Sequence, residues 1–374
     1  MPPLDASLRE QLKMLENQAL KRDLAAVEAV DGAYIWVDGK RYINFSSNDY
    51  FGLSQDSGVK RAASDALERY GAGAGASRLV TGNHALYDKL EQALAGYKRT
   101  EAACVFGSGY LANMGAITSL AAKGDVIFAD KLSHACMLDA AQLSGAKLIR
   151  FAHNDMEHLA QLLAKHRTDY TNALIITETV FSMDGDIAPM EHLRALADAH
   201  DSWLLVDDAH GIGLPHINTR LADIQVGTLS KAVGSYGGYV CASRAVIEWL
   251  HSRARSLIFS TALPPATLAA SLAAIEKITA NNFSERPLKY MSQFSEKYSL
   301  NKNQSFIQPF ILGGEQKALD ASQKLKEQGV WVSAIRPPTV PKGQARLRFT
   351  FTALHSEADM NTLFAAMDAL PWEK

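Results

Sequence analysis

The chain has 374 residues, of which 47% are hydrophobic and 21% are charged, with a formal net charge of -2. Single hydrophobic cores stop growing near roughly 250–300 residues, so we expect one large domain with a smaller companion. The composition is typical of a soluble globular enzyme. The charge argues against nucleic acid or an anionic membrane as the main partner, and no stretch approaches the roughly 20 apolar residues of a membrane span.

The cysteines and the first residues favour a cytoplasmic location. Cys104, Cys136 and Cys241 lie far apart and form no CxxC pair, which is typical of free thiols in a reducing compartment. The first thirty residues carry charged side chains from Asp5 to Lys21, so they lack the apolar region of a signal peptide.

The first hundred residues predict short, mixed elements. Residues 5–26 have the apolar spacing of an amphipathic helix, and residues 33–45 predict a hairpin that turns at Asp38-Gly39. The segment SSNDYFGL (46–53) interrupts regular structure. A helix is expected over 57–70, followed by the loop GAGAGAS (71–77).

From about residue 100, apolar strand candidates alternate with helical patterns. The predicted strands are 103–106, 126–130, 147–151, 173–177, 203–207, 224–229 and 239–242, and the helices include 109–122, 155–165 and 189–200. Buried strands that alternate with helices imply βαβ units. We therefore expect a large α/β domain with a mostly parallel central sheet.

The pattern changes after Pro264-Pro265. A helix (266–280) leads into a polar stretch (281–304) that predicts helix plus loop. Strand candidates at 306–312, 330–335 and 346–352 and a helix at 315–328 follow, and Ser356 with Asp359 resembles a capping box. This is the pattern of a small α+β domain. We expect an N-terminal segment (1–45), a large domain (46–275) and a small C-terminal domain (276–374).

An acid, a histidine and a lysine are the first candidates for chemistry. The apolar run Trp203–Val206 ends at Asp207, and ligands bind beyond the carboxyl ends of strands in open α/β sheets. His210 follows in a glycine-containing loop, and Lys231 lies among small residues in GTLSKAVG (227–234). Such a set suits a pyridoxal phosphate (PLP) enzyme, in which a lysine holds the cofactor as a Schiff base and an Asp pairs with its pyridinium nitrogen. The alternatives are a surface lysine, a capping acid and a loop histidine, and Asp208 is expected to be structural.

The segment FGSGYLANMGAITSL (106–120) predicts a phosphate site. It reads as a strand end, a tight turn and a helix start, and the first amides of a helix are unpaired and lie at the positive end of its dipole. Gly109 and Tyr110 would present those amides. An ordinary βα turn is the alternative, and the motif fits neither GxGxxG nor a P-loop.

Three further residues have both a functional and an ordinary interpretation. His134, in a loop after strand 126–130, would stack on the cofactor ring or merely cap a helix. Ser182 would donate to the phenolic oxygen. Arg336, in the stiff segment AIRPPTVP (334–341), would clamp a substrate carboxylate or form an interdomain salt bridge.

Two other kinds of site are disfavoured. No GxSxG nucleophile elbow occurs. His153, Asp155 and His158 in HNDMEHL lack metal-ligand spacing and predict a helix start instead.

The motifs SSNDYFGL, FGSGYLAN, KLSHA, TVFSMDGD, VDDAHGIG, GTLSKAVG, STALPP and IRPPTVPKGQARLR occur in this order. In this they resemble the α-oxoamine synthases, fold-type I PLP-dependent transferases with the aspartate-aminotransferase architecture. The resemblance spans about residues 8 to 370. One departure is the segment 210–231, which is shorter than the family usually has.

The resemblance implies a role for each matching residue. Lys231 would carry the Schiff base, Asp207 would pair with the pyridinium, His134 would stack on the ring, and Ser182 and His210 would contact its phenolic side. Phosphate would be bound by Gly109, Tyr110 and Thr228, and by Ser260 and Thr261 of a neighbouring subunit. The expected substrate-binding residues are Arg22, Asn48, His134, Arg336 and Thr339.

The resemblance also implies an acyltransferase that condenses an amino acid with an acyl thioester and loses CO₂. The segment IRPPTVP with ARLRFT favours members that use L-alanine and a pimeloyl thioester, carried by acyl carrier protein or coenzyme A, in biotin synthesis. A relative that uses glycine and acetyl-CoA and a fold-type I aminotransferase remain alternatives, as does a catalytically silent PLP-binding scaffold. The implied assembly is a homodimer with shared active sites.

Overall fold

The computed structural model describes residues 3–370, which form two compact units. Unit 2 contains Phe51–Ser182 and Asp186–Ser284. Unit 1 contains the residues before Phe51, the three-residue segment Met183–Gly185 and the residues from Glu285 onward. The C-terminal boundary thus falls at Ser284/Glu285, where the sequence led us to expect it at 275/276.

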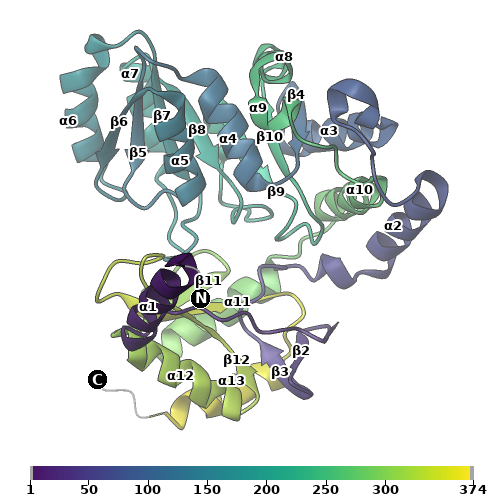
Figure 1. Ribbon diagram of the computed structural model, residues 1–374, viewed down its shortest axis with the longest axis vertical. Helices are drawn as coiled ribbons and strands as arrows, with labels where there is room; N and C mark the ends of the chain where they lie inside the picture. Colours follow the sequence, from purple (N-terminus) through teal and green to yellow (C-terminus); the bar gives the residue numbers. More distant parts are fainter. Residues whose placement is uncertain (1–2, 371–374) are drawn as a thin grey trace. The chain divides into compact units, whose positions relative to one another are not determined.

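Unit 2 is built on a seven-stranded sheet of order β4-β10-β9-β8-β7-β5-β6 (Figure 1). The strands are β4 (Ala102–Phe106), β5 (Val126–Asp130), β6 (Lys147–Phe151), β7 (Ala173–Glu178), β8 (Trp203–Asp207), β9 (Ile224–Thr228) and β10 (Gly238–Ala242). Strands β6, β5, β7, β8 and β9 pair in parallel, whereas β10 is antiparallel to both β4 and β9. The predicted α/β class and the mostly parallel sheet are confirmed.

The helices of unit 2 cover both faces of this sheet. They are α2 (Ser57–Tyr70), α3 (Ala85–Lys98), α4 (Gly109–Leu120), α5 (Ala135–Ser144), α6 (Met156–His166), α7 (Met190–Ala199), α8 (Arg244–Arg253), α9 (Arg255–Ile258) and α10 (Pro265–Ala280). Successive strand residues point to opposite faces, so Ile127 belongs to the core cluster that includes residues of α4, α5 and α8, while Phe128 belongs to the cluster that includes residues of α6 and α7. Burial on both faces explains why these strands are continuous apolar runs.

Unit 1 contains two smaller sheets, of order β1-β2-β3-β12 and β11-β14-β13. The strands are β1 (Ala29–Asp31), β2 (Tyr34–Val37), β3 (Lys40–Asn44), β11 (Ile307–Gly313), β12 (Val330–Trp331), β13 (Ser333–Ile335) and β14 (Ala345–Thr350), and the helices are α1 (Pro3–Asn17), α11 (Glu285–Lys297), α12 (Glu315–Glu327) and α13 (Glu357–Asp368). Its core includes Phe45, Phe294, Phe349 and Phe351, all with no exposed surface.

Short irregular helices complete the chain. They are η1 (Leu53–Gln55), η3 (Arg167–Asp169) and η4 (Thr219–Leu221), which are 3₁₀ helices, and η2 (Arg78–Gly82), which is a π-helix. The predicted loop GAGAGAS lies between α2 and η2. Within residues 3–370, none of the helices has both the length and the apolar character needed to cross a membrane.

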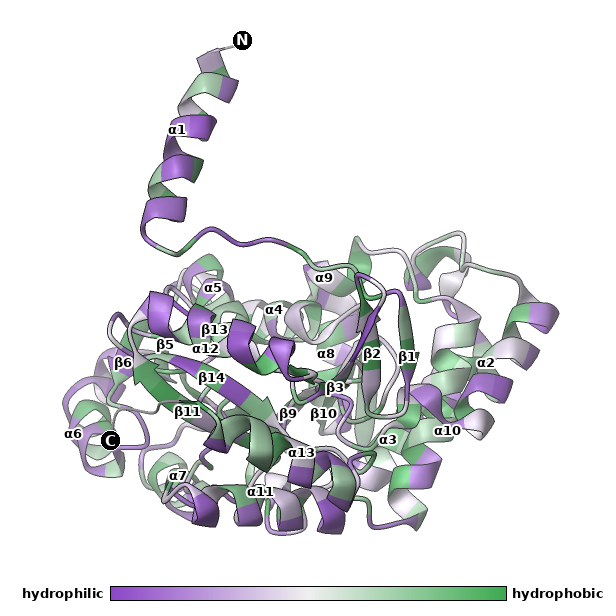
Figure 2. Ribbon diagram, turned by 90° about the horizontal axis from the view of Figure 1, so that it is seen from below, coloured by the Kyte–Doolittle hydropathy of each residue, from purple (hydrophilic) through white to green (hydrophobic). Residues whose placement is uncertain are grey.

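Of the local structures predicted for unit 1, the hairpin and the capping box are confirmed, and the N-terminal helix is shorter than predicted. The hairpin turns as predicted, with Asp38 and Gly39 at φ values of 50° and 68°, and Ser356 with Asp359 forms the expected capping box at α13. The helix predicted over 5–26 is wrong beyond Asn17, because Ala19 takes a φ of 56°. All residues of α1 are exposed, and Figure 2 shows both apolar and polar residues along it.

The segment 330–335 is also not the single strand that its sequence predicts. Residues Val330–Trp331 pair in parallel with β3, whereas Ser333–Ile335 pair antiparallel with β14 in the other sheet. Val332 lies between them and is fully buried. A segment that was predicted to be one strand is therefore divided between two sheets.

Candidate active site

Two acids lie side by side where neighbouring strands of unit 2 end. Asp207 ends β8 and Glu178 ends β7, and the two residues are in register. Asp207 is buried, and its Oδ1 accepts a hydrogen bond from the Ala209 amide at 2.9 Å. Its Oδ2 accepts one from Nδ2 of Asn113, on α4, at 2.7 Å. The predicted strand-end acid is therefore held by donors on both oxygens.

Asp208 has a structural environment, as its sequence position led us to expect. Its carboxylate forms a buried ion pair with Lys98 of α3 and accepts a hydrogen bond from the Thr179 hydroxyl at 2.6 Å. Burial alone would lower the pKa of Lys98, but the Asp208 carboxylate raises it overall. The pair fixes the backbone next to Asp207.

Lys231 and His210 lie together. Nζ of Lys231 is 2.8 Å from Nε2 of His210, within hydrogen-bonding distance. The lysine follows β9 in a turn closed by the Gly234 amide, which donates to the Lys231 carbonyl at 2.8 Å. Gly234 has a φ of 67°, and a Cβ there would lie 2.3 Å from the Ser54 amide nitrogen. The turn that presents Lys231 therefore requires glycine at this position.

His134 is both a helix cap and a neighbour of these groups. Its Nδ1 accepts the Cys136 amide at 3.3 Å at the start of α5. Its pKa is lowered, mainly because surrounding protein desolvates the ring; Asp207 opposes this lowering and Lys231 adds to it. His134 still keeps part of its surface exposed to solvent. A neutral ring with an open face is suited to stacking on a flat cofactor.

Glu178 connects the loops that carry His134 and Ser182. Its Oε2 accepts the Ser182 amide at 3.3 Å, and the His134 backbone N–H also bonds to this carboxyl. Burial and then the Asp207 charge raise the pKa of Glu178 well above its ordinary value, although Lys231 and the two amides act in the opposite direction. Two adjacent buried carboxyls do not both ionise easily, so burial beside Asp207 favours the protonated form of Glu178.

The residues predicted to bind phosphate lie at the start of α4. Ser108 caps the helix through the Leu111 amide, so the first helical residues are Gly109 and Tyr110. A Cβ on Gly109 would lie 3.2 Å from the Cβ of Thr228, which shows how closely these two backbones approach. Gly109 and Thr228 are thus brought together. The Tyr110 side chain is exposed, and its hydroxyl donates to Oδ2 of Asp139 at 2.6 Å.

Ser260 and Thr261 lie just after α9, and Thr261 forms an isolated β-bridge with Ser77. Their expected role belongs to a neighbouring subunit, so it stays a prediction.

Apart from His134, the residues expected to bind substrate lie in unit 1. The Arg22 guanidinium donates to the Thr339 hydroxyl at 2.9 Å, and Arg336 donates to the backbone carbonyls of Ala19 and Lys21. Burial lowers the pKa of Arg336, and the nearby positive charge of Arg22 lowers it further. Two guanidinium groups held near one another suit an anionic ligand.

Asn48, also in unit 1, accepts two hydrogen bonds. Its Oδ1 accepts from Nη1 of the buried Arg348 at 3.1 Å and from the Tyr50 hydroxyl at 3.2 Å. Arg348 was not among the residues predicted from sequence, because its place in the period-two strand 346–352 suggested only a strand position.

The residues of unit 2 fit PLP. They provide a lysine amine beside an imidazole, a buried aspartate for a ring nitrogen and a helix N-terminus for a phosphate. Sequence reasoning missed Asn113 and Glu178. Asn113 is a fully buried polar residue on an otherwise apolar helix, and Glu178 ends an apolar strand as Asp207 does. The place of Glu178 at the end of an apolar strand is visible in the sequence, whereas the burial of Asn113 is known only from the structure.

Comparison with known proteins gives consistent results. The family model described as aminotransferase class I and II matches residues 40–367. The chain is 50% identical to 8-amino-7-oxononanoate synthase of Methylorubrum populi, with 98% of this chain and 95% of the relative covered. It is 49% identical to the enzyme of the same name in Methylobacterium nodulans, with 99% and 97% covered.

Among solved structures, a high-resolution structure of SPT with PLP is similar over nearly the whole chain. The TM-score is 0.91 with 31% sequence identity, and 98% of this chain and 96% of that chain are covered. The resemblance inferred from the motifs is confirmed, as is the expected PLP-dependent acyltransferase class.

Proposed function

The chain belongs to the aminotransferase class I and II family and, within it, to the 8-amino-7-oxononanoate synthases, and from this premise we propose that it condenses L-alanine with a pimeloyl thioester. The products would be 8-amino-7-oxononanoate, CO₂ and a free thiol. The observation that carries the proposal is the near-full-length identity of 50% to an enzyme with that name. The finer substrate assignment agrees with the expectation from IRPPTVP and ARLRFT.

We propose that PLP is held by the residues of unit 2 described above. Lys231 would form the covalent link, Asp207 would pair with the ring nitrogen, and His134 would lie on the ring. Ser182 and His210 would contact the phenolic side, and Gly109, Tyr110 and Thr228 would bind the phosphate, with Ser260 and Thr261 contributed by a second subunit. When bound, PLP supplies an electron sink for negative charge at the α-carbon of an amino acid.

The proton chemistry would centre on Nζ of Lys231. Once released from the cofactor, this amine would remove the α-proton of L-alanine, and its neighbour His210, 2.8 Å away, would help to fix its position. A well-placed base of this kind accelerates proton transfer typically by about 10²–10⁴-fold. Asp207, fixed by Asn113, would keep the ring nitrogen protonated throughout.

The substrate would be bound through its anionic groups. Arg336 and Asn48 would hold the carboxylate of L-alanine, and Arg22 and Thr339 would contact the acyl substrate. The hydrogen bond between Arg22 and Thr339 supports a shared role for these two residues. The proposed assembly is a homodimer, and the proposed donor is pimeloyl-acyl carrier protein or pimeloyl-CoA.

A thiol-release assay tests this proposal. The holoenzyme is mixed with L-alanine, glycine or L-serine and with pimeloyl, acetyl or palmitoyl thioesters, on coenzyme A and on acyl carrier protein. We expect rapid thiol release only with L-alanine and a pimeloyl thioester, and mass spectrometry should identify 8-amino-7-oxononanoate. The Lys231→Ala variant controls for simple thioester hydrolysis. Preferential release with glycine and acetyl-CoA would instead identify the chain as a glycine C-acetyltransferase, and with L-serine and palmitoyl thioester as a relative of SPT.

A further inference from the structure

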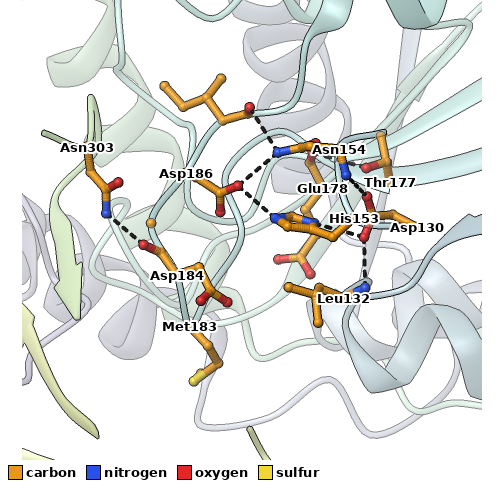
Figure 3. A network of polar contacts seen from close by, with 12 residues as sticks. Asp130, Leu132, His153, Asn154, Thr177, Glu178, Met183, Asp184, Asp186 and Asn303 are labelled. Atoms are coloured by element: carbon orange, nitrogen blue, oxygen red, sulfur yellow. Dashed lines mark hydrogen bonds and ion pairs between the residues drawn. The ribbon is translucent and has the colours of Figure 1, made fainter. Parts of the chain in front are cut away.

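The HNDMEHL motif places a histidine between two carboxylates of unit 2 (Figure 3). Nδ1 of His153 lies 3.0 Å from Oδ1 of Asp130, and Nε2 lies 2.7 Å from Oδ2 of Asp186. Asp130 ends β5, His153 follows β6, and Asp186 lies in the loop after β7. One imidazole therefore joins the ends of three strands.

The charges of this cluster are complementary. The Asp130 side chain is fully buried, and those of His153 and Asp186 are 26% and 35% exposed. Burial alone would lower the pKa of His153, but hydrogen bonds to Asp130 and then Asp186 raise it to about 10. At neutral pH the ring is a cation between two anions and donates a hydrogen bond to each.

Asn154 reinforces the same connection. Its backbone amide donates to Oδ2 of Asp130 at 2.9 Å, and its side-chain amide donates to Oδ2 of Asp186 at 2.8 Å. Asn154 has a φ of 51°, which is uncommon for a residue other than glycine. The backbone bend at Asn154 lets one residue donate to both acids.

Each acid in turn fixes a loop that carries a proposed cofactor contact. Oδ1 of Asp130 accepts the Leu132 amide at 2.7 Å, two residues before His134. The Asp186 carbonyl accepts the Phe181 amide at 3.0 Å, next to Ser182. The Phe181 ring also packs edge-on to the His153 ring, with 4.3 Å between centroids. The cluster is thus hydrogen-bonded to both loops, through the Leu132 amide and the Phe181 amide.

We propose that His153, bound between Asp130 and Asp186, is a positioning residue. It fixes the positions of His134 and Ser182 relative to the cofactor. It does not touch the reacting atoms. This inference rests on the roles proposed above for His134 and Ser182.

The matched control is His158, in the same motif. Its Nδ1 accepts the Ala152 amide at 3.0 Å, so it stabilises the segment that leads into α6, and this hydrogen bond is with neither loop. Replacing either histidine by alanine removes a partly buried imidazole from the same segment. A purely structural role for His153 would therefore give the two variants similar properties.

The experiment compares wild type, His153→Ala and His158→Ala by PLP titration, by the pH dependence of the bound-cofactor absorbance and by kcat and KM. We expect His153→Ala to weaken PLP affinity and lower kcat by about 10- to 100-fold, since small displacements of contact groups have effects of this size. The pH midpoint of the cofactor absorbance should also shift. Added imidazole should restore part of the affinity, and His158→Ala should stay within about threefold of wild type in each property.

The proposal is overturned if His153→Ala matches His158→Ala in PLP affinity, absorbance midpoint and kcat. If His153→Ala does not fold, His153→Gln, which keeps a donor for one acid, is expected to show the same changes to a smaller degree, and a Gln variant identical to wild type would refute the proposal. A wild-type enzyme that binds PLP but does not condense L-alanine would refute the proposed reaction alone, because the PLP titrations would still decide the role of His153.

Discussion

Nδ2 of Asn113 donates a 2.7 Å hydrogen bond to Oδ2 of Asp207, and both side chains are buried. The same Nδ2 also lies 3.3 Å from the Gly109 carbonyl, at the start of the helix that would bind phosphate. Asn113 therefore connects the residues expected to hold opposite ends of the cofactor. This relationship makes Asn113 a direct test of the site.

Replacing Asn113 by alanine should weaken PLP binding. A buried acceptor that loses its donor costs about 1–3 kcal/mol, and about 1.4 kcal/mol corresponds to a tenfold change in affinity. We expect PLP affinity to fall by about tenfold or more in a titration followed by absorbance. Asn172→Ala is the control, because Asn172 makes a similar 2.9 Å bond to Asp125 at the opposite ends of the strands. Equal effects of the two variants would argue against a role for Asn113 in the site.

Replacing Lys231 by alanine should abolish covalent cofactor attachment and turnover together. We expect borohydride reduction to add the mass of the cofactor to the wild-type protein and not to the variant. Thiol release should fall by at least about 10³-fold, because both the tether and the base are lost. Retained turnover would disprove the assignment of Lys231.

The effect of replacing Glu178 on kcat should depend on whether the new side chain mimics a protonated acid. Burial and the neighbouring Asp207 raise the pKa of Glu178 well above its ordinary value, which favours the protonated form of its carboxyl. Glutamine, which is neutral and has a similar shape, should keep kcat within about threefold. Alanine removes the acceptor of the Ser182 amide and should lower kcat by about tenfold. Equal losses in both variants would show that the ionised form is needed.

His355 should make the stability of unit 1 depend on pH. Burial lowers its pKa to about 4, and its ring accepts the Thr352 amide at 3.0 Å and bonds to the Asn44 carbonyl at 3.1 Å. Because the unfolded chain binds a proton near pH 6.5 and the folded ring does not, this contribution is complete above pH 6.5 and is lost as the pH falls towards 4. Denaturant unfolding between pH 7 and 4.5 should show a smaller decline in His355→Gln than in wild type. The exposed His216→Gln variant should decline as wild type does.

The strands of unit 2 were predictable for a physical reason. A parallel strand covered on both faces is a continuous apolar run, and Asp207 and Lys231 stand out because they follow such runs. Apolar character predicts a buried strand but does not specify which strand it pairs with. It therefore could not predict that residues 330–335 divide between two sheets. Likewise Leu8, Leu12 and Leu15 predicted a helix correctly as far as Asn17, but periodicity gave no sign of the left-handed Ala19.

The site was predictable only where function leaves a local pattern. Turns rich in glycine, strand-end acids and an isolated lysine are visible in the sequence. The links between them are not, because Asn113 reaches Asp207 and His153 reaches Asp186 across the tertiary fold. Which residues distant in sequence contact one another can be predicted only when the order of the strands in the sheet is known.

The position of β4 has a consequence for how the protein folds. This strand is the first of the large sheet to be synthesised, but it lies at the edge and pairs with β10, the last, with Phe106 opposite Gly238. A nascent chain would expose the unpaired β4 while more than a hundred further residues are translated. Closing such long loops is slow and leaves strand edges open to aggregation. The proposed phosphate site at the start of α4, which follows β4, therefore forms late, so cofactor capture should be one of the last events in folding.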